Sequence, residues 1–490
     1  MSETFLGHPR GLATLFFTEM WERFTYYGMR TVLVLFLVTA ASSGGFGIDD
    51  KTATAIYGLY TAGVYLAALP GGWIADRLIG ARRAVLVGGA AIALGNTLLA
   101  VSTTPREFYL GLVVIVLGVG LLKPNVSAMV ADLYPEGGAR RDAGFSMFYM
   151  GINLGATIGP FVTAEAQQLI GARAGFGAAA LFMVFGVVQY YFTQHHLGEA
   201  GRFAPEPAAH ARGKPWVQLW VGLGLAALGL AVLSFGWIAV DPVRLAQAST
   251  VLIAVTALLF FGYLFFAANL DREERRHALV IVVLFVGSVL FWSGYEQAGS
   301  SLNLFAERYT DRTLGAIHFV IPAGFFQSLN PLFVITFAPL FGWLWVAMAR
   351  RNLNPSAPAK FAIGVMLMGS GFLLMAAASE IVAHGSKVLP YWLIVTYLLH
   401  TFGELCLSPV GLSYVTKLSP KRFVGQLMGM WFLSLSLGNL AAGLIAGEFD
   451  ASNVAAMPGQ YMRIVYFAVG LGAVLLVLSR PVKKLMGAVQ

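Results

Sequence analysis

Residues 13–40 read ATLFFTEMWERFTYYGMRTVLVLFLVTA, an apolar stretch longer than the roughly 20 residues that an α-helix needs to cross a bilayer. Four charged side chains interrupt it: Glu19, Glu22, Arg23 and Arg30. A charge at the centre of a span costs about 2.5–3.5 kcal/mol on insertion scales. The stretch therefore predicts a transmembrane helix whose charged residues face protein rather than lipid.

Stretches of the same kind recur along the whole chain of 490 residues. Hydrophobic residues make up 58% of the sequence and charged residues only 11%, whereas a soluble protein has roughly a quarter charged residues. We predict fourteen spans, near 13–40, 52–76, 84–103, 108–131, 143–170, 175–194, 216–238, 247–269, 277–304, 315–349, 361–382, 389–416, 423–447 and 461–479. The predicted fold class is an all-α membrane protein.

The basic residues are distributed unevenly among the predicted loops. With both termini in the cytoplasm, the pairs Arg82-Arg83, Arg140-Arg141 and Arg350-Arg351 all fall on the cytoplasmic side, and the opposite loops hold few lysines or arginines. This asymmetry satisfies the positive-inside rule. The net charge of +8 therefore reflects topology and attraction to anionic lipid, not a nucleic-acid partner.

Two polar connections divide the predicted helices into blocks. The connection around 195–215 is rich in Pro, Gly and Ala, and 271–276 is a run of charges. We expect an N-terminal six-helix bundle (1–196), a cytoplasmic linker with a two-helix insert (197–275), and a C-terminal six-helix bundle (276–490). A weak similarity between PGGWIADR after span two and APLFGW in the second block suits a transporter built from duplicated halves.

Three further charges, Lys123, Glu296 and Glu404, interrupt other predicted spans. With those of the first span, four carboxylates face three cations, so one proton would balance the set. On a helix, the first-span charges share one face with Tyr26 and Tyr27. The alternative interpretations are a structural ion-pair network, and for Lys123 a lysine that snorkels to the interface.

Other chemistry is not indicated by the sequence. Cys406 is the only cysteine and lies in an apolar run, where it is expected to act as a small buried hydrophobe. The sequence has neither a phosphate-binding P-loop nor a zinc-protease H-E-x-x-H motif, which argues against an ATP-driven pump and an intramembrane enzyme. We expect no catalytic site, cofactor or metal. The N-terminus does not read as a signal peptide, and a bacterial cytoplasmic (inner) membrane is the expected location.

Four motifs along the chain resemble those of one family. In the first span, Glu19-x-x-Glu22-Arg23-Phe24-x-Tyr26-Tyr27-Gly28 is similar to the first-helix signature of the proton-dependent oligopeptide transporters, a branch of the major facilitator superfamily. Its fifth-, seventh- and tenth-helix signatures are similar to 148–156 (FYMGINLGA), 291–297 (FWSGYEQ) and 403–409 (GELCLSP), respectively. The segment 71–83 is similar to a less specific loop motif of the wider superfamily. The resemblance covers nearly the whole chain.

The resemblance implies a fold, an activity and residue roles. The fold is two six-helix bundles with two inserted helices, and the activity is import of di- and tripeptides by proton symport and alternating access. The proton-coupling residues are Glu19, Glu22, Arg23, Lys123 and Glu296, with Glu22 a partner of Lys123. The substrate-binding residues are Tyr26, Tyr27, Arg30, Tyr65, Lys123, Asn153, Trp292, Asn330, Glu404, Ser408 and Trp431.

Within that set, Arg30 and Lys123 are expected to face the peptide carboxylate, and Glu404 its amino group. Asp76 and Arg77 are expected to brace a gate rather than to touch substrate. Partners other than peptide, protons and lipid are not expected, and a monomer suffices because one bundle encloses a complete path.

Two residues, Glu404 and Gly58, bear on the alternative function and on the difference from animal relatives. A transporter of nitrate or another small organic solute on the same scaffold is the alternative function, and Glu404 argues against an anion. Animal relatives carry a histidine in the second helix where this chain has Gly58. We therefore expect carboxylates alone to bear the proton coupling.

Overall fold

A computed structural model describes residues 4–202, 240–315, 319–449 and 453–487, together with 217, 218, 220, 221 and 224. Twelve helices of these residues are long and apolar enough to cross a membrane. Helix α1 (Arg10–Val38) has the length of a span but carries the four charges noted above. The predicted span 216–238 lies largely outside the described residues. The all-helical membrane fold is confirmed.

The chain divides into two compact units, one of residues 1–47 and 63–241, the other of residues 48–62 and 242–490. The boundary falls within α2, so the first half of this helix belongs to the C-terminal unit and its second half to the N-terminal unit. Each unit is described by itself below.

The N-terminal unit is built from long helices joined by short connections. A two-residue hairpin precedes α1, and a π-helical turn follows α2. Its elements are β1 (Thr4–Phe5), β2 (His8–Pro9), α1, η1 (Ala41–Ser43), α2 (Asp50–Ile74, shared), η2 (Ala75–Ile79), α3 (Ala81–Val101), α4 (Pro105–Asp132), α5 (Gly138–Leu169), α6 (Ala174–Thr193) and η3 (Gln194–Leu197).

Small residues allow these helices to pack closely, as expected in lipid. Helices α3 and α4 lie against each other along Gly88 and Gly118, where an added Cβ would meet the facing backbone. Helix α1 packs on α5 and α6. At the α1–α5 contact, Gly155 and Gly159 of α5 meet the backbone of α1.

The N-terminal hairpin is held to the α4–α5 connection. His8 Nδ1 lies 2.8 Å from the Tyr134 hydroxyl, with the two rings edge to face. Burial raises the pKa of Tyr134. The chain before α1 is therefore attached to the bundle.

The C-terminal unit is also built from helices, with 3-10 turns directly before four of them. Its elements are α8 (Pro242–Phe266), α9 (Arg272–Tyr295), η4 (Glu296–Gly299), α10 (Ser301–Tyr309), β3 (Thr313–Leu314), β4 (Phe319–Val320), η5 (Ala323–Ser328), α11 (Leu329–Arg350), α12 (Ala357–Ala383), α13 (Tyr391–Leu418), η6 (Lys421–Phe423), α14 (Val424–Ala446), η7 (Val454–Ala456) and α15 (Met457–Leu485).

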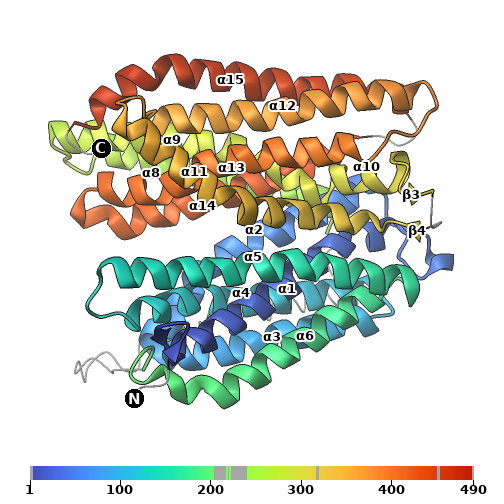
Figure 1. Ribbon diagram of the computed structural model, residues 1–490, viewed down its shortest axis with the longest axis horizontal. Helices are drawn as coiled ribbons and strands as arrows, with labels where there is room; N and C mark the ends of the chain where they lie inside the picture. The colour runs from blue at the N-terminus through green and yellow to red at the C-terminus, as the bar shows by residue number, and fades with distance from the viewer. Residues whose placement is uncertain are drawn as a thin grey trace. The chain divides into compact units, whose positions relative to one another are not determined.

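Packing within this unit follows the chain order only in part. Helix α12 lies alongside both α13 and α15, and α14 packs on α8 and α9 (Figure 1). The first half of α2 joins them because Gly58 allows its backbone to approach Gly443 of α14.

Two expected spans differ from the structure in detail. The span predicted at 277–304 is not one regular helix, because α9 ends at Tyr295 and a 3-10 turn separates it from α10. The span predicted from 315 begins later: 319–320 pair with 313–314 as a hairpin, and η5 starts after Pro322. Proline lacks the backbone N–H that a helix interior requires, so it favours this boundary.

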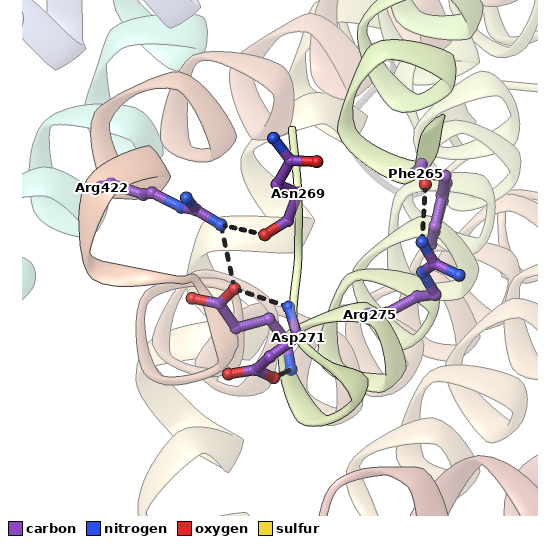
Figure 2. A network of polar contacts seen from close by, with 6 residues as sticks. Phe265, Asn269, Asp271, Arg275 and Arg422 are labelled. Atoms are coloured by element: carbon purple, nitrogen blue, oxygen red, sulfur yellow. Dashed lines mark hydrogen bonds and ion pairs between the residues drawn. The ribbon is translucent and has the colours of Figure 1, made fainter. Parts of the chain in front are cut away.

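A polar network fixes the entry to α9 (Figure 2). Asp271 caps the helix by accepting the Glu274 N–H at 2.8 Å, while the Glu274 carboxylate accepts the Asp271 N–H at 3.2 Å. Arg422 donates to this carboxylate at 3.1 Å and to the Asn269 carbonyl at 3.0 Å. Arg275 donates to the Phe265 carbonyl at the end of α8. The network therefore joins α8, α9 and the loop before α14.

Candidate functional site

The charged stripe of α1 forms a buried ion triad. Glu19, Glu22 and Arg23 are 2%, 0% and 4% exposed. Arg23 Nε lies 3.3 Å from Glu19 Oε1 and also pairs with Glu22 Oε2. Buried charges require such compensation, and the helical repeat places position 19 one turn below position 23. The expectation that these residues share a face is met.

The triad leaves two acceptors over. Glu19 Oε2 and Glu22 Oε1 are buried and have no hydrogen-bond partner among the described residues. One arginine thus faces two carboxylates, each with one oxygen unused. A proton on either carboxyl would weaken its pairing with Arg23, so the arrangement suits proton exchange.

Aromatic rings accompany the cations of this unit. The guanidinium carbon of Arg30 lies 4.8 Å from the centre of the Tyr27 ring and 5.9 Å from that of Tyr26. The Tyr26 ring also lies 5.0 Å from Arg23, so it stands between the two arginines. Cation–π attraction of this kind helps to orient a guanidinium. The structure therefore groups the predicted residues Tyr26, Tyr27 and Arg30.

Lys123 has the same kind of neighbour. It precedes Pro124 within α4, and its ammonium nitrogen lies 4.6 Å from the centre of the Tyr65 ring. Lys123 and Glu19 also interact electrostatically. The structure thus brings Lys123, Tyr65 and the α1 triad into one region. The expected partnership of Lys123 with Glu22 stays a prediction.

Asn153 of α5 is 6% exposed, and its amide nitrogen donates to the Tyr149 carbonyl one turn earlier at 2.9 Å. That bond uses one of its two N–H groups, and the side-chain oxygen is an acceptor.

In the C-terminal unit, Glu404 is held by two donors. The Tyr295 hydroxyl and the Asn330 amide each donate to Glu404 Oε2 at 2.9 Å. The Asn330 amide also donates to the Thr401 hydroxyl at 3.0 Å. These bonds fix the orientation of the carboxylate. The structure therefore brings together Asn330 and Glu404, which are both predicted substrate ligands.

Tyr295 was not predicted as a site residue. It appears in the FWSGYEQ motif, but nothing in the sequence pairs it with position 404, which is 109 residues away. The available signal was a hydroxyl-bearing ring in an apolar helix, since a buried tyrosine hydroxyl usually has a hydrogen-bond partner.

Glu296 has a second unpredicted tyrosine as its partner. The Tyr57 hydroxyl donates to Glu296 Oε2 at 3.2 Å, with Tyr57 fully buried and Glu296 3% exposed. The next residue is Gly58, where a larger residue has little room. An ideal Cβ at position 58 would lie 3.1 Å from the Asn439 carbonyl oxygen and 3.2 Å from Gly443 Cα.

Within the described part of the chain, the side chains of the remaining predicted residues take no part in the hydrogen bonds and ion pairs given above. The Trp292 indole N–H is buried and has no acceptor among the described residues, and Trp431 is buried edge to face with Phe361. Ser408 is exposed on α13, one turn after Glu404. Asp76 and Arg77 are both exposed in the η2 turn.

Known proteins are similar to this chain over nearly its whole length. The POT family model matches residues 82–464. The peptide transporter YePEPT of Yersinia enterocolitica is 42% identical over 99% of this chain and 97% of its own. A di-/tripeptide transporter of Lactococcus lactis subsp. lactis is 35% identical over 100% of this chain and 98% of its own.

Solved structures agree as well. A crystal structure of a glutamate-to-glutamine mutant of peptide transporter POT, in complex with alafosfalin, matches with a TM-score of 0.90 at 38% identity. The match covers 99% of this chain and 98% of that one. The chain described here belongs to the POT family, the proton-dependent oligopeptide transporters that its motifs resemble.

Proposed function

We propose that this protein is a proton-coupled symporter that imports di- and tripeptides by alternating access. The observation that carries the proposal is Glu404, a carboxylate oriented by Tyr295 and Asn330 inside a membrane helix. An intramembrane ionisable group marks a functional site by default. A fixed carboxylate attracts the ammonium group of a peptide and repels nitrate or another anion. The two relatives described above, which are named a peptide transporter and a di-/tripeptide transporter, support the same substrate.

The N-terminal unit supplies the complementary charge. Arg30 and Lys123, each beside tyrosine rings, are assigned to the peptide carboxylate. A dipeptide separates its two charges by roughly 7 Å when extended. Fixing the ends by charge leaves side-chain recognition to the remaining substrate residues, which are Tyr26, Tyr27, Tyr65, Asn153, Trp292, Asn330, Ser408 and Trp431.

The α1 triad and Glu296 are assigned to proton coupling. Protonation of Glu22 or Glu19 would weaken its pairing with Arg23, and a ligand or proton shifts a conformational equilibrium only through such differential contacts. Lys123 is shared between coupling and carboxylate binding. Asp76 and Arg77 are assigned to gating.

The proposed setting follows the sequence. The protein spans a bacterial inner membrane fourteen times, with two six-helix bundles, a two-helix insert and both termini in the cytoplasm. It works as a monomer, catalyses no reaction and needs no cofactor, because the proton gradient is its energy source.

Uptake of labelled dialanine into proteoliposomes tests the proposal. An inward-acid gradient is expected to drive accumulation by the unaltered protein. Glu404→Gln removes the negative charge assigned to the ammonium group, so uptake should fall at least about tenfold, equivalent to about 1.4 kcal/mol. Glu22→Gln should lose accumulation while retaining some exchange.

Glu380→Gln is the matched control. Glu380 is an exposed carboxylate on α12, and its neutralisation should leave uptake unchanged. Nitrate uptake in place of dialanine uptake, or full dialanine uptake by Glu404→Gln, would contradict the peptide assignment.

A further inference from the structure

One break in a helix of the C-terminal unit contains Glu296 and is linked to Glu404, because Tyr295 beside it donates a hydrogen bond to Glu404. Regular α-helix ends at Tyr295, a 3-10 turn covers Glu296–Gly299, and Ser300 has φ −124° and ψ −98° before α10 resumes. A local change from α to 3-10 geometry often marks a functional hinge. Tyr295 and Glu296 are consecutive residues on the two sides of this boundary.

Tyr295 connects the break to Glu404. Its ring is stacked on Phe291 with centroids 5.4 Å apart and lies edge to face with Trp292 at 5.1 Å. Phe291 and Trp292 thus hold the Tyr295 ring in place, and the Tyr295 hydroxyl donates to Glu404 at 2.9 Å. A shift of the backbone at position 295 would move this donor relative to Glu404.

Tyr57 connects the other side of the break to α2. Its hydroxyl donates to Glu296 at 3.2 Å, and its ring lies against Gly299, where a Cβ would not fit. The Tyr57–Glu296 bond is charge-assisted when Glu296 is ionised and loses much of its strength when the carboxyl is neutral. The charge of Glu296 therefore affects how firmly the 3-10 turn is held to α2.

We propose that Tyr295 is a positioning residue that makes the affinity of Glu404 for the peptide ammonium group depend on the charge of Glu296. The inference rests on the proposed function, which assigns the amine to Glu404 and proton exchange to Glu296. Neutral Glu296 loosens the turn from Tyr57, the backbone at the break adjusts, and the Tyr295 hydroxyl moves relative to Glu404. Tyr295 and Glu296 are adjacent, and each contacts a residue far away in the sequence: Glu404 is 109 positions from Tyr295, and Tyr57 is 239 positions from Glu296. The two adjacent residues thereby couple these two contacts.

A double-mutant cycle tests this coupling. The dissociation constant of dialanine is measured for the unaltered protein, Glu296→Gln, Tyr295→Phe and the double variant, with the glutamine standing in for the neutral carboxyl. We expect Glu296→Gln to change the dissociation constant about fivefold or more, within the usual range for coupled sites. In the Tyr295→Phe background the same change should alter it less than about twofold. Equal factors in both backgrounds would overturn the proposal.

Tyr57→Phe gives an independent second cycle, because it removes the donor at Glu296 itself. Tyr57→Phe should also suppress the effect of Glu296→Gln on the dissociation constant of dialanine. This second cycle tests the coupling even if Tyr295→Phe binds dialanine too weakly to measure. The full Glu296→Gln effect in the Tyr57→Phe background would count against the proposal.

Tyr397→Phe is the matched control, since this buried hydroxyl donates to the Ala298 carbonyl of the same turn at 3.3 Å, not to a carboxylate. The effect of Glu296→Gln on the dissociation constant should persist in the Tyr397→Phe background. Loss of the effect there would mean that any loosening of the turn abolishes the coupling, and it would overturn the role of Tyr295.

Glu404→Gln separates the proposed function from the proposed coupling. If Glu404→Gln binds dialanine normally, the proposed function fails; if it does not bind and the cycles are additive, only the coupling fails.

Discussion

Arg23 is the residue on which the charge balance of the N-terminal unit depends. It pairs with both Glu19 and Glu22, and all three side chains are at most 5% exposed. We predict that Arg23→Ala destabilises the protein by roughly 3–5 kcal/mol, because it removes the ion-pair partner that the two buried carboxylates share. A lower midpoint of thermal unfolding in detergent is the expected observation.

Removal of one carboxylate provides the control for this prediction. In the double variant Arg23→Ala, Glu22→Gln, Glu19 is the only acid left in the triad, so part of the lost stability should return. Unchanged thermal unfolding of Arg23→Ala would show that the carboxyl groups are already neutral in the folded protein.

Among the elements, the α3–α4 pair shows most directly how glycine sets helix packing. An ideal Cβ at Gly118 would lie 2.7 Å from the Gly88 carbonyl oxygen and 2.9 Å from the Ile92 nitrogen, and these backbone atoms cannot move without the helix. We predict that Gly118→Ala destabilises the protein by about 1–3 kcal/mol through overpacking. Thermal unfolding of the purified variant would measure the loss.

Gly470 of α15 is the matched position, because nothing lies within 4 Å of its ideal Cβ. Alanine has the higher helix propensity by about 1 kcal/mol, so Gly470→Ala should be neutral or stabilising. Equal effects at both glycines would mean that propensity, not the α3–α4 contact, governs stability.

At the scale of the whole molecule, the main feature is that α2 is divided between the two units. Its first residue, Asp50, accepts two hydrogen bonds from Arg308 of α10, at 2.5 and 2.8 Å. This bidentate pair attaches the start of α2 to the C-terminal unit. We predict that Asp50→Arg and Arg308→Asp each reduce dialanine uptake and stability. The double reversal should recover about 0.5–3 kcal/mol of coupling energy.

The exposed pair Glu199–Arg202 offers a comparison, with side chains 81% and 62% exposed. Its charge reversal should change stability by less than about 1 kcal/mol. Additive effects of the two reversals at Asp50 and Arg308 would show that the pair contributes nothing as a pair.

The sequence by itself determined the membrane fold and the location of the buried charges. A bilayer has no water to satisfy backbone groups, so long apolar stretches are forced to be helices whatever their tertiary contacts. Likewise the 3.6-residue repeat places Glu19 and Arg23 on one face before any packing is known. The helix α1, its ion triad and the family motifs could therefore be predicted from local sequence.

Only the tertiary structure decided which helices those charges face. The Tyr295–Glu404, Tyr57–Glu296 and Asp50–Arg308 contacts join residues 109, 239 and 258 positions apart. Their formation depends on the rotation and depth of each helix in its unit, and spans that are apolar all round give little indication of rotation. The break after Tyr295 has no proline to announce it. Distant packing, not local propensity, therefore made tyrosines the partners of both carboxylates.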